Sequence, residues 1–282
     1  MSGATVTAAL RAGGKALSEA GIEGGARDLR LLMAHVLGIE AARMTLHLQD
    51  ELPAAAAAAF ETLVVRRMAR EPVSHLIGRR AFFGRAFSVT ADVLDPRPET
   101  EALVLAALER PFERVLDLGT GSGCILLTLL CEQASARGVG ADLSAAALEI
   151  FASNRAALVL EARAGSCLSD WYDGLSQARG PYDLIVSNPP YISLEEMAAL
   201  APELGYEPRM ALTDEADGLS AYRKICERAV EFLAPSGRLI VEIGPTQGAD
   251  VAALMGAAGL EAVQILPDLD GRELVVFGIR PA

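Results

Sequence analysis

The sequence has 282 residues, 51% of them hydrophobic and 22% charged, and a formal net charge of −12. This composition indicates a globular protein that can bury a sizeable core, and it excludes a disordered chain. The length allows two ordinary domains. Proteins that bind a phosphate backbone rely on clustered Lys and Arg, so the acidic balance opposes direct nucleic-acid binding, although it leaves room for a local basic patch.

Cysteine and histidine usage gives no sign of a metal site, because none of the four cysteines and three histidines stands at a spacing typical of zinc ligands. Cys124 and Cys131 lie in an apolar stretch, which favours packing roles for reduced thiols. Near the start of the chain, Arg11 and Lys15 interrupt the apolar residues, which disfavours a signal peptide. Since no run of roughly 18 uncharged apolar residues occurs either, we expect a cytoplasmic protein without a membrane span.

The first part of the chain, up to about residue 72, predicts a small bundle of helices. Apolar residues recur at helical spacing in two stretches. Gly38 is the expected stop of the first stretch, and Pro53 suits the first turn of the second. The expected buried faces consist of Leu29, Leu32, Met33, Val36 and Leu37 in one helix and of Phe60, Leu63, Val64 and Met68 in the other.

A basic cluster, formed by Arg66, Arg67 and Arg70, lies at the end of the second predicted helix. Its charges complement the negative end of the helix dipole, which favours a solvated face. The alternative is a docking patch for an acidic partner. The sequence pattern leaves both interpretations open.

The rest of the chain changes character twice. Between residues 73 and 96, Gly78, Gly84 and alternating apolar residues predict a β-hairpin that links two domains. From residue 97 onward, strands alternate with helices, which predicts an α/β fold with a mostly parallel sheet covered on both faces. Strands are expected at residues 114–118, 139–142, 159–164, 182–186, 238–243, 263–266 and 274–279, and helices at residues 124–130, 145–158 and 220–233.

A glycine-rich loop connects the first of these strands to the helix that follows it. The loop consists of Gly119, Thr120, Gly121, Ser122 and Gly123. Glycines let the backbone turn tightly and approach a ligand closely. The G-x-G-x-G spacing differs from that of dinucleotide-binding and Walker loops. It resembles the first motif of S-adenosylmethionine enzymes, and a purely structural turn is the alternative.

Asp142 ends the second predicted strand of the sheet. A carboxylate at this position can accept hydrogen bonds from both ribose hydroxyls of an adenosyl group. The alternative is a helix N-cap formed by Asp142 or Ser144. The glycine loop upstream favours the ribose interpretation.

The segment Asn188-Pro189-Pro190-Tyr191 follows the fourth predicted strand. The Asn188 side chain and the Pro189 carbonyl offer two acceptors to one planar –NH₂ group, and the Tyr191 ring can lie against that group. An amide or aromatic amine nitrogen is a poor nucleophile because its lone pair is delocalised. Acceptors that hold its hydrogens stabilise the positive charge that develops on nitrogen during methyl transfer. The segment therefore predicts N-methylation.

Together these motifs resemble the peptide chain release factor glutamine methyltransferase family over nearly the whole chain. The tetrapeptide alone is shared with adenine N6-methyltransferases, but its combination with Arg97-Pro98-Glu99-Thr100-Glu101 is specific to the family. The other matching segments are Glu71-Pro72-Val73, Ile77-Gly78, Phe83-Gly84, Phe87-Ser88-Val89, the glycine loop with Leu116-Asp117-Leu118, Ser169-Asp170-Trp171, Glu207-Pro208 and Asp217-Gly218-Leu219.

The resemblance implies three parts and one reaction. A helical domain over residues 1–72 docks on the release factor, residues 73–96 form a β-hairpin linker, and residues 97–282 form a seven-stranded, Rossmann-like methyltransferase domain. The enzyme transfers a methyl group from S-adenosyl-L-methionine to the side-chain nitrogen (N5) of the glutamine in a Gly-Gly-Gln motif. A monomer is expected, because the enzyme has to enclose a loop of its protein substrate.

The resemblance also implies roles for individual residues. The cofactor is expected to contact Gly119, Thr120, Gly121, Ser122, Gly123, Asp142, Trp171 and Asn188, and the glutamine is expected to contact Asn188, Pro189, Pro190 and Tyr191. Trp171 is expected to flank the adenine, with a core aromatic as the alternative. Arg97, Glu99 and Thr100 are expected at the methionine end of the cofactor, with an interdomain turn as the alternative.

Two rival functions remain at this stage. An adenine N6-methyltransferase acting on nucleic acid would require a basic groove, which the net charge of −12 opposes. A non-catalytic adaptor would have no need to combine Asn188 with the glycine loop.

Overall fold

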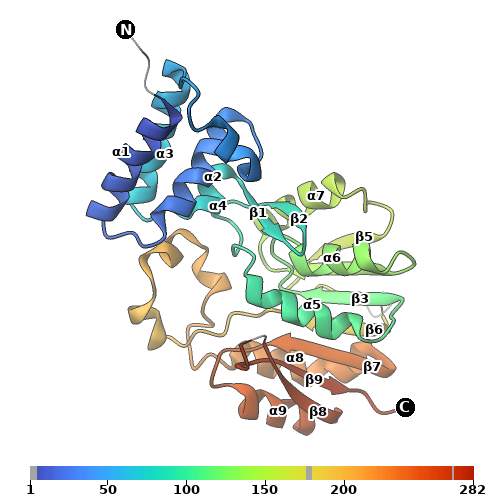
Figure 1. Ribbon diagram of the computed structural model, residues 1–282. Helices are drawn as coiled ribbons and strands as arrows, with labels where there is room; N and C mark the ends of the chain where they lie inside the picture. The colour runs from blue at the N-terminus through green and yellow to red at the C-terminus, as the bar shows by residue number, and fades with distance from the viewer. Residues whose placement is uncertain (1–4, 176–179, 269) are drawn as a thin grey trace. The chain divides into compact units, whose positions relative to one another are not determined.

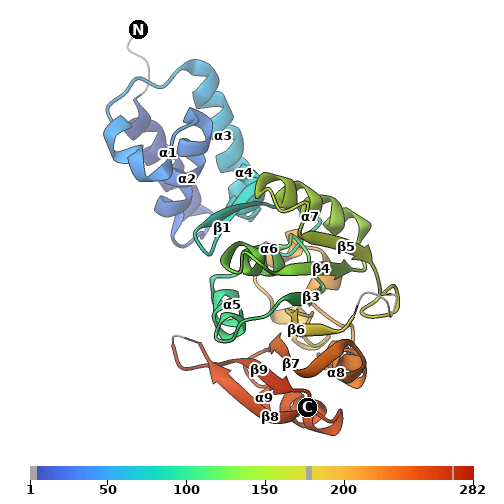
Figure 2. The same cartoon turned by 90° about the vertical axis from the view of Figure 1, so that its right-hand side faces the viewer.

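The computed structural model describes residues 5–175, 180–268 and 270–282 (Figures 1 and 2). Its contacts divide the chain into two compact units. The helical unit comprises Met1–Arg79 with Ala201–Tyr206, and the sheet unit comprises Arg80–Leu200 with Glu207–Ala282. None of the helices in the described ranges combines the length and the apolar composition that crossing a membrane requires.

The helical unit is a bundle around one apolar core, as the spacing of apolar residues predicts, except that Met68 at the end of α3 is 38% exposed and does not belong to the core. Helix α2 ends at Gly38, which adopts the left-handed conformation with φ of 65°. Thr5 caps α1 by accepting a hydrogen bond from the Ala8 N–H. The elements are α1 (Val6–Glu19), α2 (Gly25–Leu37), η1 (Ala41–His47), α3 (Ala54–Met68), α4 (Val73–Ile77) and η5 (Pro202–Tyr206).

Helix α4 corrects part of the sequence prediction, because residues 73–77 are helical and do not belong to the β-hairpin. The helix starts after Pro72, whose fixed φ suits a helix start, and stops at Gly78 with φ of 69°. The hairpin itself is formed by β1 (Arg79–Phe82) and β2 (Arg85–Ser88).

The interpretation of the basic cluster at the end of α3 as a solvated face is wrong for Arg67 and Arg70, which form ion pairs inside the helical unit. Arg67 is 8% exposed and donates to Asp28 at 2.8 Å and to Glu203 at 3.2 Å. Arg70 donates to the same Glu203 oxygen at 3.3 Å. Only Arg66 matches the solvated interpretation, with a side chain that is 48% exposed. The segment that carries Glu203 is distant in the sequence, so no local pattern could reveal this burial.

Replacing Arg67 with alanine is expected to lower the free energy of unfolding by about 3 kcal/mol, because Asp28 then loses its arginine partner and Glu203 keeps only Arg70. Arg66→Ala is the matched control on the same helix, and its loss should stay below about 1 kcal/mol, since the Arg66–Glu71 pair is exposed on the arginine side. Urea unfolding followed by circular dichroism measures both. Equal losses for the two variants would contradict the structural role of Arg67.

The sheet unit contains a seven-stranded sheet with the order β5-β4-β3-β6-β7-β9-β8. Neighbouring strands from β5 to β7 are parallel, and β9 is antiparallel to both β7 and β8. The strands are β3 (Arg114–Leu118), β4 (Arg137–Asp142), β5 (Ala164–Leu168), β6 (Tyr182–Ser187), β7 (Leu233–Glu242), β8 (Glu261–Pro267) and β9 (Glu273–Ile279). The helical segments are η2 (Pro98–Thr100), α5 (Glu101–Leu108), α6 (Cys124–Glu132), α7 (Ala145–Ala157), η4 (Glu196–Ala199), η6 (Arg209–Ala211), α8 (Ser220–Phe232) and α9 (Gly248–Ala257).

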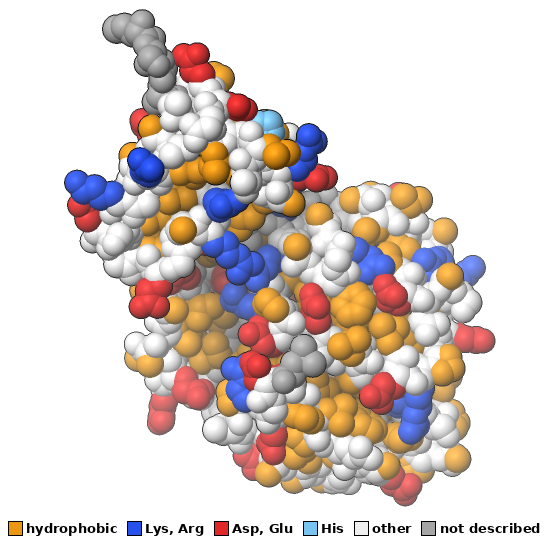
Figure 3. All heavy atoms as spheres, viewed as in Figure 1, with side chains coloured by type: hydrophobic (Ala, Val, Ile, Leu, Met, Phe, Trp, Pro, Cys, Tyr) orange, Lys and Arg blue, Asp and Glu red, His pale blue; other side chains and the backbone are white. Residues whose placement is uncertain are grey.

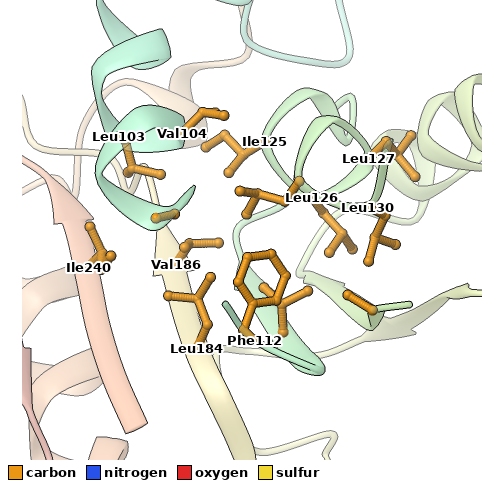
Figure 4. Packing of buried hydrophobic residues seen from close by; sticks show 14 of the residues in the cluster. Leu103, Val104, Phe112, Ile125, Leu126, Leu127, Leu130, Leu184, Val186 and Ile240 are labelled. Atoms are coloured by element: carbon orange, nitrogen blue, oxygen red, sulfur yellow. The ribbon is translucent and has the colours of Figure 1, made fainter. Parts of the chain in front are cut away.

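Both faces of the sheet are covered, because successive strand residues point to opposite sides. Leu184 and Val186 of β6 pack with α5, α6 and α7 on one side, as Figure 4 shows for the labelled part of this cluster. Ile185 of the same strand packs with α8 and α9 on the other side. The near-continuous apolar runs in the central strands therefore produce a sheet buried on both faces.

One strand of the sheet lies later than predicted. Residues 159–164 were expected to form it, but β5 covers Ala164–Leu168. Val159 is 82% exposed with φ of 57°, whereas Leu160 is buried as an anchor after α7. The apolar pair thus belongs to the turn, and the strand itself uses small side chains at the edge of the sheet. The other predicted strands and helices of this unit are confirmed to within a few residues at their ends, except that β7 starts earlier.

Candidate active site

A cavity opens at the carboxyl ends of the central parallel strands. Strand β3 is the switch point of the sheet, since the chain continues from it to β4 on one side and later places β6 on its other side. Loops that leave two such strands diverge and make a crevice for ligands. The lining residues are Asp92, Val93, Leu94, Pro96, Arg97, Thr100, Gly119, Thr120, Gly121, Ser122, Cys124, Ile125, Asp142, Leu143, Ser144, Ala147, Ser169, Asp170, Trp171, Asn188, Pro190, Pro208, Met210 and Ala211.

The glycine loop follows β3 and contributes its first four residues to the cavity. Gly119 and Gly121 have φ of 71° and 54°, which side chains rarely tolerate. The backbone N–H groups of Gly119 and Thr120 donate to the Ala141 carbonyl at 2.8 and 3.0 Å, so the loop is tied to the end of β4. A Cβ added to Gly121 would meet nothing within 4 Å among the described atoms, which means that it would project into open space.

Gly123, the last residue of the loop, is placed differently. It has φ of 81°, and a Cβ there would lie 2.6 Å from the Phe151 ring and 2.9 Å from Leu127. It does not line the cavity. This geometry explains its glycine by packing at the start of α6, and its contact with a cofactor stays a prediction.

Asp142 stands at the cavity with both carboxylate oxygens engaged by the backbone. The Gly121 N–H donates to Oδ2 at 2.8 Å and the Ser144 N–H donates to Oδ1 at 2.9 Å. Ser144 is the N-cap of α7, because its hydroxyl accepts from the Ala147 N–H. Each Asp142 oxygen keeps a free lone pair that can accept a ligand hydroxyl. Burial raises the pKa of Asp142, and the backbone N–H groups oppose that rise.

Trp171 lines the cavity in a left-handed backbone conformation, with φ of 48°. Such a conformation is unfavourable for a bulky residue and persists only where neighbours hold it. The Ser169 hydroxyl does so by donating to the Trp171 carbonyl at 2.7 Å and accepting from the Gly174 N–H at 2.8 Å. The ring also packs against the core cluster under α8. Both interpretations of Trp171 therefore have structural support.

The Asn-Pro-Pro-Tyr segment leaves β6 beside the glycine loop. Asn188 and Pro190 line the cavity, whereas Pro189 and Tyr191 do not. The Asn188 amino group donates to the Thr100 hydroxyl oxygen at 3.2 Å. The backbone carbonyl of Tyr191 accepts a hydrogen bond from the Gln247 side chain at 2.9 Å. Burial raises the pKa of the Tyr191 phenol to about 12. Roles of these four residues toward a substrate stay predictions.

The Arg97-to-Glu101 segment supplies the remaining predicted residues. Arg97 and Thr100 line the cavity, and Glu99 does not. Arg97 donates to Glu207, which is 7% exposed. Burial raises the pKa of Glu207, although the Arg97 guanidinium opposes the rise.

Several lining residues escaped the sequence prediction. Leu143 and Met210 keep 58% and 48% of their surface exposed although they are large and apolar. Leu143 directly follows Asp142, so its position at a strand end is a signal that could have identified it. Met210 lies in an irregular segment where no periodicity points to it. Cys124, predicted as a packing residue, packs against the core and also borders the cavity.

Comparison with known proteins shows which family this chain resembles. Two family models match, the PrmC N-terminal domain over residues 8–78 and the Methyltransferase small domain over residues 91–217. A release factor glutamine methyltransferase of Cereibacter sphaeroides is 54% identical over 275 residues, which are 97% of this chain and 98% of that protein. One of Rhodospirillum rubrum is 44% identical over 270 residues, 94% of this chain and 82% of that protein.

The chain belongs to the release factor glutamine methyltransferase family. It is therefore an enzyme of the protein-glutamine N-methyltransferase class, as the resemblance implied. The rival interpretation as a non-catalytic adaptor loses its support.

Solved structures share the fold. A methyltransferase from Pyrococcus furiosus has a TM-score of 0.55 at 14% identity and covers 79% of this chain and 98% of its own. The 16S rRNA N2 G1207 methyltransferase of T. thermophilus, solved with AdoMet and guanosine, has a TM-score of 0.51 at 20% identity and covers 72% of this chain and 49% of its own. These likenesses confirm the predicted α/β methyltransferase fold.

Proposed function

We propose that this protein transfers a methyl group from S-adenosyl-L-methionine to the side-chain nitrogen (N5) of the glutamine in the Gly-Gly-Gln motif of a peptide chain release factor. The observation that carries the proposal is the meeting of Asn188 with the glycine loop and Asp142 in one cavity. The relatives from Cereibacter sphaeroides and Rhodospirillum rubrum are both named release factor glutamine methyltransferases, which supports the same substrate.

The residues of the cavity fit the proposed cofactor. Asp142 retains acceptor capacity for two hydroxyls, which suits a ribose. The open space beside Gly121 lets a ligand approach the backbone, and Trp171 offers a flat apolar ring. When bound, S-adenosyl-L-methionine supplies a methyl group on a positively charged sulfur. Arg97 and Thr100 are the candidates for its methionine end.

The chain's own contribution to catalysis is orientation and charge stabilisation. We infer that Asn188 Oδ1 and the Pro189 carbonyl accept the two hydrogens of the glutamine amide and so direct its nitrogen at the methyl group. A bond forms between nitrogen and the methyl carbon, the carbon–sulfur bond breaks, and nitrogen loses one proton. Because nitrogen becomes more positive along this path, the two acceptors bind the transition state more tightly than the ground state.

The acceptor is proposed to be a protein and not a nucleic acid. On the face shown in Figure 3, Lys and Arg side chains lie in separate groups with acidic side chains among them. A phosphate backbone favours a continuous basic surface instead. The helical unit is proposed to dock on the release factor, and the enzyme is proposed to act as a cytoplasmic monomer.

A transfer assay tests the proposal with two acceptors in parallel. Labelled S-adenosyl-L-methionine is offered with a release factor or with an adenine-containing oligonucleotide. We expect label on the release factor, and loss of that label when the glutamine of its Gly-Gly-Gln motif is replaced. Label on the oligonucleotide alone would refute the proposal in favour of adenine N6-methylation.

A further inference from the structure

A buried carboxyl group lies directly beside the Asn-Pro-Pro-Tyr segment and has no place in the mechanism so far. Glu242 is the last residue of β7 and is 1% exposed. Ser187 pairs with Val241 in the parallel ladder, so Asn188 and Glu242 follow at the carboxyl ends of neighbouring strands. The Thr100 and Asn188 side chains lie against the Glu242 carboxylate closely enough that hydrogen bonding from both lowers its pKa. Its Oε2 atom is buried and has no hydrogen-bond partner among the described residues.

These contacts decide which end of the Asn188 amide reaches the cavity. An amide has two N–H donors at one end and a carbonyl acceptor at the other, and the two ends have nearly the same shape. The Asn188 amino group already donates to the Thr100 oxygen at 3.2 Å. An ionised carboxylate can only accept, so it binds the same amino end. With both N–H donors engaged on this side, Oδ1 is the end left for a ligand.

We propose that Glu242 is a positioning residue, whose buried carboxylate, together with the Thr100 hydroxyl, holds the amino end of Asn188 so that its Oδ1 accepts from the substrate nitrogen. This inference rests on the proposed function, because it assigns the orientation that glutamine methylation needs. Glu242 does not touch the substrate and acts through Asn188 alone.

The ionisation of Glu242 makes the arrangement sensitive to pH. Burial raises the pKa of Glu242 to about 7, although the hydrogen bonds from Thr100 and Asn188 oppose the rise. Above that pH, the ionised carboxylate accepts from Asn188. Below it, the neutral acid accepts hydrogen bonds more weakly than the carboxylate, and its new O–H group can compete for the carbonyl end of the Asn188 amide. Turnover is therefore expected to fall as the pH drops through about 7.

The other groups around Glu242 do not produce this pH dependence. Burial raises the pKa of Tyr191 and of Cys124 to about 12 and that of Tyr222 well above its usual value, so all three stay neutral near pH 7. The charged neighbours are Arg97, which lowers the pKa of Glu242, and Glu99, which raises it. Tyr222 donates its hydroxyl to the Glu242 backbone carbonyl at 2.9 Å, not to the side chain.

The test compares Glu242→Gln with Asp117→Asn in the full-length enzyme. Asp117 is a second buried carboxyl group with a pKa raised to about 7, but its bond goes to Thr120 and not to Asn188. We expect Glu242→Gln to lower kcat above pH 8 by roughly 10-fold, because a neutral amide oxygen accepts hydrogen bonds more weakly than a carboxylate and therefore holds Asn188 less firmly. Binding of S-adenosyl-L-methionine, measured by calorimetry, should change little. The fall of kcat below pH 7 should disappear in Glu242→Gln and persist in Asp117→Asn.

Three outcomes overturn the inference: wild-type kcat in Glu242→Gln, a pH dependence that persists in it, or one that disappears in Asp117→Asn instead. Failure of the proposed function can be distinguished from failure of this inference, because in that case the wild-type enzyme transfers no label to a release factor at any pH. If Glu242→Gln does not fold, nitrogen-edited NMR of the wild-type protein decides. The Asn188 side-chain amide resonances should then shift with a midpoint near pH 7, and constant resonances refute the inference.

Discussion

Replacing Asn188 with alanine is expected to lower kcat for release-factor methylation by roughly 1000-fold, because one of the two acceptors that orient the glutamine nitrogen is lost. Binding of S-adenosyl-L-methionine should weaken but remain detectable, since Asn188 is one of many residues that line the cavity. Single-turnover kinetics with saturating cofactor and substrate separate the two effects.

Ser193→Ala provides a control for disturbance of the same loop. The Ser193 hydroxyl bonds only to Glu196 in the described structure and does not line the cavity. Its kcat should stay near the wild-type value. If Asn188→Ala turned over at the wild-type rate, the orienting role of Asn188 would be refuted, whatever the identity of the substrate.

The second large effect is expected at Asp142, where replacement with alanine should weaken binding of S-adenosyl-L-methionine by roughly 100- to 10,000-fold. Two hydrogen bonds from ribose hydroxyls to a charged acceptor are lost, at about 1.5–3 kcal/mol each. The loop also loses its ties from the Gly121 and Ser144 N–H groups. Isothermal titration calorimetry with the cofactor or its demethylated product measures the change.

Asp183→Ala is the matched control for this loss of backbone contacts. Asp183 also accepts from two backbone N–H groups, those of Glu113 at 2.9 Å and Arg114 at 2.8 Å. It lies near the start of β6, whereas the cavity lies at the carboxyl ends of the strands. Cofactor affinity should therefore be unchanged in Asp183→Ala. Equal affinity loss in both variants would mean that Asp142 acts only through the fold.

Local features of the sequence predicted those parts of the site that one short segment can build. The glycine loop needs positive φ at Gly119 and Gly121, and only glycine adopts that conformation without cost. Alternation of strands and helices places the carboxyl ends of β3, β4 and β6 at one edge of the sheet, so Asp142 and Asn188 could be expected near the loop. Each of these inferences depends on neighbours in the chain.

Features that depend on distant segments were missed or misjudged. Arg67 has the composition of a surface residue, yet Glu203, which is 136 positions away, accepts its hydrogen bonds. The apolar pair at Val159 and Leu160 has the composition of a strand, yet only Leu160 finds a place in the core. Burial is decided by what packs on a residue from elsewhere, and neither periodicity nor spacing contains that information.

For Asn188, one part of its role follows from the sequence and another part follows only from the tertiary structure. The sequence by itself determined that an asparagine followed by two prolines ends a strand and offers acceptors to one planar –NH₂ group. Only the tertiary structure brought Thr100 and Glu242 against the opposite end of its amide. The physical reason is that hydrogen bonds between side chains require proximity in space, and residues 100, 188 and 242 become neighbours only when β6 and β7 pair and η2 packs at their ends.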